Sequence, residues 1–285
     1  MSYLLYLGIV LSSVTQSASN KAFYKGGGTQ VVFNAIKALS AVALMLIVGL
    51  FRFEFHLPTL LFGISYGVLL TVAMYAGYEA LRRGPMALTS MLVSFSVLIP
   101  FLWGVAVKGE TLAPWQYGGI LLLLLAFLAT NADKLKKSAS NRGSYGVWLL
   151  FVALTFAANG AGSVLQTEHQ ALYPGLYQKE LTLFAMCVCA IVYFVWLLAS
   201  VSLRRAWQTK GKGYAALSGL ANACVSFLTA LLAATENASV LFPVISAGSA
   251  LGVLLCGRVI FREKLKINHY AALALGISAV ILLKI

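Results

Sequence analysis

Residues 109 to 119 read GETLAPWQYGG, and residues 262 to 272 read REKLKINHYAA. The two stretches align at a shift of 153 residues, which pairs Glu110 with Glu263 and leaves each as a lone acid between strongly apolar runs. We call this short polar stretch between two apolar segments a corner. Its occurrence twice indicates an internal duplication. It also places one junction between two apolar segments in each half of the chain.

The composition predicts a membrane protein. Hydrophobic residues make up 60% of the 285 residues, charged residues only 10%, and the mean hydropathy is +0.87. A water-soluble domain with these values would expose a very large apolar surface. The net charge of +13 does not indicate nucleic-acid binding, because the basic residues lie in short groups between apolar segments. The four cysteines fall inside apolar segments and are interpreted as packing residues.

Ten apolar segments are long enough to cross a bilayer, since a spanning helix needs about 20 apolar residues. The expected fold class is therefore an all-α integral membrane protein with ten transmembrane helices. The short connections leave no room for a soluble domain. The expected segments lie at about residues 3–22, 29–51, 59–81, 86–107, 113–131, 144–165, 175–200, 213–234, 238–259 and 267–284.

The alignment of the two halves extends beyond the opening corner. At the shift of 153, ALRRGPMALTS matches AATENASVLFP, and at a shift of 142 Lys37 matches Lys179. Because each half holds five helices, an odd number, the halves must cross the membrane in opposite senses. We expect an inverted repeat, with residues 1–132 as the first half, 133–143 as a basic connecting loop and 144–285 as the second half.

The basic residues between the segments separate strongly by membrane face. Because Lys and Arg are retained in the cytoplasm, both termini are expected outside it and the loop at residues 132–143 inside it. The poorly charged face has only Arg52, Lys108 and Lys284. The other face carries Lys21, Lys25, Arg82, Arg83, Lys134, Lys136, Lys137, Arg142, Arg204, Arg205, Lys210, Lys212, Arg258, Arg262, Lys264 and Lys266.

Polar side chains recur at helical spacing on four segments. Such groups must find partners in hydrocarbon, so these faces are expected to turn inward, either to neighbouring helices or to a wet cavity. The cavity is favoured because the first and sixth segments, which are repeat partners, both carry a stripe. Ser94 is a further candidate, and Tyr66 is open to substrate contact or packing. The stripes are Ser13, Gln16 and Asn20; Thr71, Tyr75 and Tyr78; Asn159, Ser163 and Gln166; and Asn222, Ser226 and Thr229.

Lys37 lies about eight residues into the second segment, or about 12 Å at 1.5 Å per residue, which is too deep for an ordinary interfacial lysine. It is expected to face the bundle interior and to pair with an anionic or zwitterionic substrate, or with a carboxylate that exchanges a proton. An internal ion pair, or a side chain that reaches back to the start of the segment, stays open as an alternative. Lys179 is a second candidate contact, although its position just after YPG favours a structural role.

Both glutamates of the opening corner are expected to begin the last helix of their half. A carboxylate there accepts from free N–H groups and meets the positive end of the helix dipole. For Glu110 and Glu263, this structural role at the start of a helix is favoured over a role in coupling transport to an energy source.

Several motifs in a fixed order make the chain similar to a known family. They are the lysine of ASNKAF, the basic residue of FNAIKALSAVALM, the segment entries EALRRGPMALTSML and ATENASVLFPVIS, and the GE…WQ..G corner. Together with the five-plus-five repeat, they make the whole chain resemble the drug/metabolite transporter superfamily, in particular its ten-helix EamA group. The chain departs from that family at Ser13 and Val14, where a Trp-Gly pair is common, and in the orientation that its charges predict.

The resemblance implies a secondary transporter that moves a small organic metabolite by alternating access between the repeats. The short chain favours the plasma membrane as its location. Amino-acid or related metabolite export is the favoured function, while an importer and a drug or nucleotide-sugar transporter stay open. Proton coupling, exchange and facilitated diffusion also stay open, as does the choice between monomer and homodimer. Membrane lipids and the metabolite are the expected partners.

Other classes of function find less support in the sequence. The three histidines have no HExxH spacing, no base for serine chemistry is identifiable, and there is no GxxxxGK[ST] nucleotide motif, so we expect neither an enzyme nor a cofactor or metal site. A non-transporting membrane scaffold is the alternative from another class. It would not require so many polar residues inside the spans, because unpaired polar groups in lipid are costly.

Overall fold

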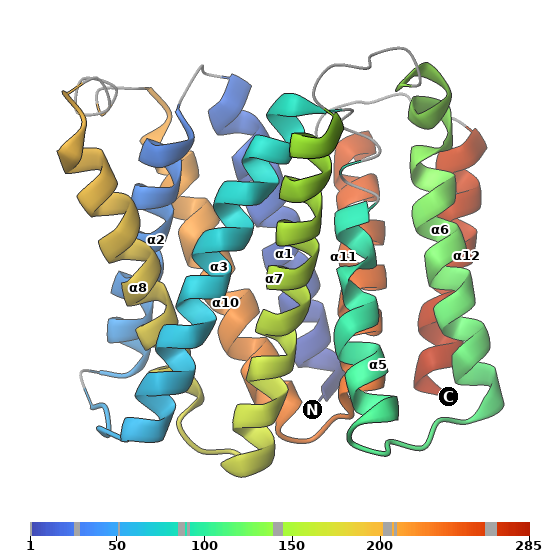
Figure 1. Cartoon of the computed structure of the whole chain (residues 1–285). Helices are drawn as coiled ribbons and strands as arrows, with labels where there is room; N and C mark the ends of the chain where they lie inside the picture. The colour runs from blue at the N-terminus through green and yellow to red at the C-terminus, as the bar shows by residue number, and fades with distance from the viewer. Residues whose placement is uncertain are drawn as a thin grey trace. The chain divides into compact units, whose positions relative to one another are not determined.

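The structure of the protein, a computed structural model, describes residues 2–25, 29–50, 52–84, 89, 92–138, 145–201, 207, 210–259 and 267–285. Helices are the only regular secondary structure in these residues (Figure 1). The α-helices are α1 Ser2–Lys25, α2 Gln30–Val48, α3 Leu57–Arg83, α5 Leu98–Ala106, α6 Pro114–Ser138, α7 Tyr145–Leu172, α8 Gln178–Ala199, α10 Lys212–Ala233, α11 Ala238–Val259 and α12 Ile267–Lys284, and a 3₁₀ turn, η1, covers Phe95–Val97.

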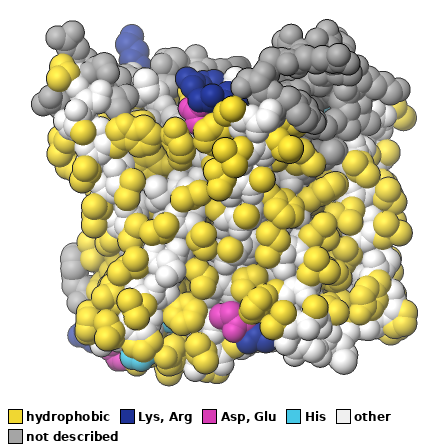
Figure 2. All heavy atoms as spheres, in the orientation of Figure 1, with side chains coloured by type: hydrophobic (Ala, Val, Ile, Leu, Met, Phe, Trp, Pro, Cys, Tyr) yellow, Lys and Arg dark blue, Asp and Glu magenta, His cyan; other side chains and the backbone are white. Residues whose placement is uncertain are grey.

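Seven of the described helices are long and apolar enough to cross a membrane: α2, α3, α7, α8, α10, α11 and α12. α1 has 24 residues but is too polar, because its second half contains SSVTQSASNK. The apolar stretches Leu92–Ala106 and Pro114–Ala129 are shorter. On the face that Figure 2 shows, hydrophobic side chains cover the middle of the helices, and charged side chains lie near the helix ends. This pattern is that of a helical, multi-pass membrane protein.

α6 and α7 extend well beyond the expected segments, and the 3₁₀ turn η1 interrupts the segment expected at 86–107. α6 runs on to Ser138, through the first part of the expected 133–143 loop, because ADKLKK has good helix formers and no Gly or Pro. α7 continues to Leu172, past the expected end at residue 165. It stops before Pro174 and Gly175, and Gly175 takes a positive φ of 72° that ends the helix.

The described chain divides into two compact units. Unit 1 comprises Met1–Thr71 and Leu165–Thr235, and unit 2 comprises Val72–Val164 and Glu236–Ile285. The boundaries fall inside α3 and α7, so each unit takes helices from both halves of the sequence. The repeat halves expected from the sequence are therefore a different division of the chain.

In unit 1, α1 packs on α10, and α2 packs on both α8 and α10. Figure 1 shows that α2 and α8 run in opposite directions, as do α1 and α10. Gly219 permits a close approach of α10 to α2, because a Cβ at this position would lie 2.0 Å from the carbonyl oxygen of Lys37. An interhelical hydrogen bond at the same place runs from the Ser40 hydroxyl to the carbonyl of Ala216, at 3.0 Å.

In unit 2, α6 packs on α12, and α11 packs on both α12 and α5. α6 and α12 run in opposite directions in Figure 1. Gly119 lies against α12, where a Cβ would come within 2.9 Å of the Leu283 side chain. An ion pair of 2.7 Å joins Lys284 to Glu236, which precedes α11.

The Glu110 carboxylate binds the first turn of a helix, but not of the helix expected. Its oxygens accept from the backbone N–H groups of Ala238 and Ser239 at 3.1 and 2.9 Å, and from the Ser239 hydroxyl. These residues begin α11, which comes from the second half of the chain, whereas the expected partner was the helix that follows Glu110. Glu110 thus connects the two halves within unit 2. Its repeat partner Glu263 lies outside the described residues.

Candidate functional site

Two amide side chains of α1 bond to α10 inside unit 1. Gln16 donates from Nε2 to Asn222 Oδ1 at 2.9 Å, and Asn20 Oδ1 accepts from the Ser218 hydroxyl at 2.7 Å. Asn222 in turn donates to the sulfur of Met186 on α8 at 3.5 Å. The polar face expected on the first segment is therefore turned inward, and its groups reach partners that are far away in sequence.

Lys37 lies near the middle of α2, seven residues after its first residue, and only 7% of its surface is exposed. The side chain lies close enough to the Cys189 thiol of α8 for the two to interact electrostatically. Among the described residues, no group forms a hydrogen bond or an ion pair with its ammonium. The internal ion pair that the sequence left open is thus not formed within the described part of the chain.

A second set of polar contacts, which includes the Cys189 thiol, joins α3, α7, α8 and α10. Tyr66 accepts from Gln166 Nε2 at 2.7 Å, and its hydroxyl lies 3.5 Å from that of Ser226. Thr71 and Cys189 both donate to the Gly67 carbonyl of α3, at 2.8 and 3.5 Å, and Thr71 Oγ1 lies 3.3 Å from Cys189 Sγ. We call these buried and half-buried residues the polar core of unit 1: Gln16, Asn20, Lys37, Tyr66, Thr71, Gln166, Cys189, Ser218, Asn222 and Ser226.

Five of the predicted site residues belong to unit 2. Ser163 donates to the backbone carbonyl of Asn159 at 3.1 Å, so this pair is partly satisfied within α7 itself. Tyr75 packs edge-on against Phe151, with ring centroids 6.1 Å apart. Tyr78 is half-buried on α3, and Ser94 is half-buried directly before η1.

Lys179 lies in the first turn of α8, apart from the polar core. Its Nζ donates to the backbone carbonyl of Arg52 at 2.7 Å and lies 3.6 Å from Glu180 and 5.7 Å from the ring centre of Phe53. The side chain is 36% exposed. These contacts connect the start of α8 to the segment between α2 and α3.

The Gln170 side chain forms hydrogen bonds with the segment that connects α7 to α8. Its Oε1 accepts from the backbone N–H of Gly175 at 3.2 Å and from Gln178 Nε2 at 3.1 Å. Its Nε2 donates to the carbonyl of Leu176 at 3.1 Å. Since backbone groups bind both ends of the amide, its orientation is fixed, and Nε2 must also be the donor to His169 Nδ1 at 2.9 Å.

The fixed amide determines the proton positions in a chain of three further groups. Because His169 Nδ1 accepts, the ring is neutral and its Nε2–H donates to Thr59 Oγ1 at 2.9 Å. The Thr59 hydroxyl is then left to donate to His56 Nδ1, also at 2.9 Å. His56 stacks on Tyr177 with centroids 4.5 Å apart. This buried network closes one end of unit 1 around α3, α7 and α8.

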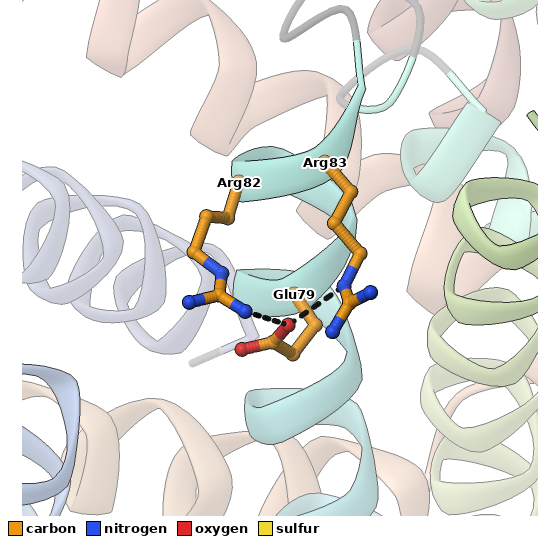
Figure 3. A network of polar contacts seen from close by, with 3 residues as sticks. All are labelled: Glu79, Arg82 and Arg83. Carbon is orange, nitrogen blue, oxygen red and sulfur yellow. Dashed lines mark hydrogen bonds and ion pairs between the residues drawn. The ribbon is translucent and has the colours of Figure 1, made fainter. Parts of the chain in front are cut away.

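A charged cluster lies near the C-terminal end of α3, in unit 2. Glu79 Oε2 accepts from both Arg82 and Arg83 at 2.9 Å (Figure 3). The Arg83 guanidinium also lies over the ring of Phe151, at 5.1 Å. Because both arginines share one carboxylate oxygen on their own helix, the cluster is a satisfied helix end.

Sequence reasoning missed Ser218, Met186 and Cys189 as members of this site or its neighbours. Ser218 lies four residues before Asn222 and so belongs to the same face of α10, a signal that extending the stripe by one turn would have found. Cys189 and Met186 carry no such signal, because sulfur side chains in an apolar helix are ordinary packing residues.

Comparison with known proteins bears on the fold alone. No family model and no curated protein matches the chain. A solved structure, described only as "Crystal structure of protein", is similar over 99% of this chain and 95% of its own, with a TM-score of 0.78 and 16% sequence identity. At this identity the similarity establishes a shared fold over nearly the whole chain.

Proposed function

We propose that the protein is a secondary transporter of the drug/metabolite transporter type, with ten membrane-spanning helices in two inverted five-helix repeats. It moves a small organic metabolite across the plasma membrane by alternating access between the repeats. Export of amino acids or related metabolites is the function that the sequence favours. Both termini lie outside the cytoplasm, and the 132–143 loop lies inside it.

The contacts within the two units support the duplication. Exchanging the proposed repeats maps α2 on α8, α5 on α11 and α6 on α12, and each helix packs on its own equivalent. The same exchange maps α1 on α7 and α10 on α3, so the α1–α10 contact predicts a contact between α7 and α3. The hydrogen bond from Gln166 to Tyr66 is such a contact. Equivalents α2 and α8 run in opposite directions, as do α6 and α12 (Figure 1), as an inverted repeat requires.

The observation that carries the proposal is Lys37 in its polar surroundings. A charged side chain deep in a membrane-spanning helix is costly and is found mainly on substrate or ion pathways. Here its ammonium has no partner among the described residues, and the Cys189 thiol that interacts with it lies 3.3 Å from the Thr71 hydroxyl; amide and hydroxyl groups of α1 and α10 bond to one another in the same unit. A scaffold gains nothing from this arrangement, whereas a binding site for an anionic group requires it.

The test is untargeted mass spectrometry of the medium from cells that express the protein or its Lys37→Ala variant at equal membrane abundance. A metabolite enriched outside only with the unmutated protein identifies the substrate and the direction of transport. Lys179→Ala is the matched control, since Lys179 lies apart from the polar core, and it should export like the unmutated protein. The same metabolite composition in the medium of cells with each of the three proteins and of cells without the protein would contradict export.

A further inference from the structure

We propose that the polar core of unit 1 binds a small organic carboxylate that carries no amine, with Lys37 as its counter-ion. This rests on the transport function proposed above and narrows its substrate class, because the sequence alone favoured amino acids. The inference follows from the charges and hydrogen bonds that surround Lys37.

Lys37 is the one ionised side chain of the polar core; its other members are amides, hydroxyls, a phenol and a thiol. In a region shielded from water, a single ammonium is compensated by one negative charge. A monocarboxylate gives a neutral pair with Lys37. With a zwitterionic amino acid bound, Lys37 and the ligand together carry a net charge of +1, and with an amine they carry +2. Both ligands are therefore disfavoured there.

No acid of unit 1 is placed to compensate a second ammonium. The unit contains only Glu54, Glu168 and Glu180, and its residues outside the described ranges include no Asp or Glu. Glu54 is exposed between α2 and α3. Glu180 accepts from the backbone of Glu54 at 3.2 Å, and it precedes Cys189 by nine residues, or about 13 Å along α8 at 1.5 Å per residue.

Glu168 starts from a different face of α7 than Gln166 does. It follows Gln166 by two residues, which rotates it by about 200° around α7 at 100° per residue. Gln166 itself points to Tyr66 in the polar core, so the Cα–Cβ bond of Glu168 leaves α7 on the opposite side. The three acids therefore lie at helix ends or on other faces.

Three acceptors in and beside the polar core already take hydrogen bonds. Asn222 Oδ1 accepts from Gln16, and Asn20 Oδ1 accepts from Ser218. The carbonyl of Gly67 accepts from both Thr71 and Cys189. A substrate ammonium would share these acceptors with the groups that already donate to them, whereas a carboxylate would meet an ammonium that has no partner among the described residues.

The experiment measures ligand-induced thermal stabilisation of the purified protein in low-salt detergent solution. The probes are two matched series, propanoate with alanine and propylamine, and phenylpropanoate with phenylalanine and phenethylamine, so that only the charged groups differ within a series. Chloride is a separate arm. The variants are Lys37→Met, which removes the charge, and Lys179→Met, which removes a lysine outside the core.

We expect at least one acid to raise the Tm of the native protein and of Lys179→Met but not of Lys37→Met. Its amino-acid counterpart should bind at least about tenfold more weakly, a difference that corresponds to about 1.4 kcal/mol. The proposal is overturned if no acid stabilises the native protein, if the amino acid binds as well as the acid, if Lys37→Met responds like the native protein, or if chloride alone reproduces the shift.

Flux measurements on the same samples in proteoliposomes separate the two proposals. A carboxylate that binds through Lys37 but does not cross the bilayer contradicts the transport function and leaves this inference intact. Flux of alanine or of propylamine without flux of the matched acid supports transport and overturns the inference.

Discussion

A buried ammonium without a counter-charge destabilises the protein that carries it until an anion is bound. Lys37 is in this position, because its side chain is buried and no described group pairs with it. Removing the charge should therefore cost no hydrogen bond or ion pair within the described part of the chain. This sets Lys37 apart from Arg82, Arg83 and Lys284, each of which has a carboxylate beside it.

We predict that Lys37→Met raises the Tm of the unliganded protein by about 2 °C or more, since removing about 1 kcal/mol of buried-charge penalty shifts a chain of this size by about that amount. Differential scanning fluorimetry in detergent measures the shift. Lys37→Arg is the control and should not be stabilised, because it keeps the charge. A large loss of stability in Lys37→Met would show that the ammonium has a native partner.

Thr59 is the second residue whose role the structure makes specific. We predict that Thr59→Val lowers the free energy of unfolding by about 1–3 kcal/mol, because the buried His169 N–H loses its acceptor. Thr15→Val provides the comparison, since the Thr15 hydroxyl donates to the carbonyl of Leu11 in its own helix and has no other partner among the described residues. Chemical unfolding of both variants measures the difference, and equal effects would argue against the histidine network.

At the residue scale, sequence patterns identified the polar faces of α1 and α10 and the depth of Lys37, because helical period and hydropathy report which side of a helix turns inward. They did not identify which groups pair. Gln16 and Asn222 are 206 residues apart, and their bond depends on the packing of α1 on α10. The same limit applies to Glu110, whose partner helix begins far away in sequence.

The contact of α2 with α10 depends on one glycine. We predict that Gly219→Ala destabilises the protein by about 1–3 kcal/mol, because the added methyl group collides with the backbone of Lys37 and with Ser40. Gly213→Ala on the same helix is the matched control, because nothing lies within 4 Å of its added Cβ. Thermal unfolding measures both variants. Similar Tm values would mean that the helices are not this close.

The first turn of α11 depends on Glu110. We predict that Glu110→Gln costs about 1–2 kcal/mol, because the charge at the helix N-terminus and one of two acceptor oxygens are lost. Glu54→Gln, at an exposed side chain, is the control and should change the Tm little. Faster hydrogen exchange confined to the start of α11 would support the capping role. Unchanged exchange there would contradict it.

At the scale of elements, the apolar segments predicted nearly all helices, since hydropathy determines where a chain can cross a bilayer. The ends of α6 and α7 were harder to predict, because helix propensity carries α6 into a charged segment and the Pro174–Gly175 pair, not the loss of hydropathy, ends α7. The division into units was not predictable from hydropathy, because it reflects packing between helices from the two halves.

For the whole molecule, the distribution of basic residues predicts the orientation in the membrane. Single cysteines at Ser2 and Ser140, introduced after replacing the four native cysteines, should react differently with a membrane-impermeant maleimide in intact cells. We expect label at position 2 only, because the positive-inside rule puts residue 140 in the cytoplasm. Permeabilised cells provide the control. Label at position 140 only would invert the topology.

The most direct test of the central claim is metabolite flux through the purified protein. Liposomes that contain the protein are loaded with a small-molecule metabolite extract, and the metabolites that leave them over time are identified by mass spectrometry, in parallel with the Lys37→Met variant and with empty liposomes. The account predicts that one small class of metabolites, rich in carboxylates, leaves only the liposomes with the unmutated protein. Identical release from all three preparations would contradict a transport function centred on Lys37.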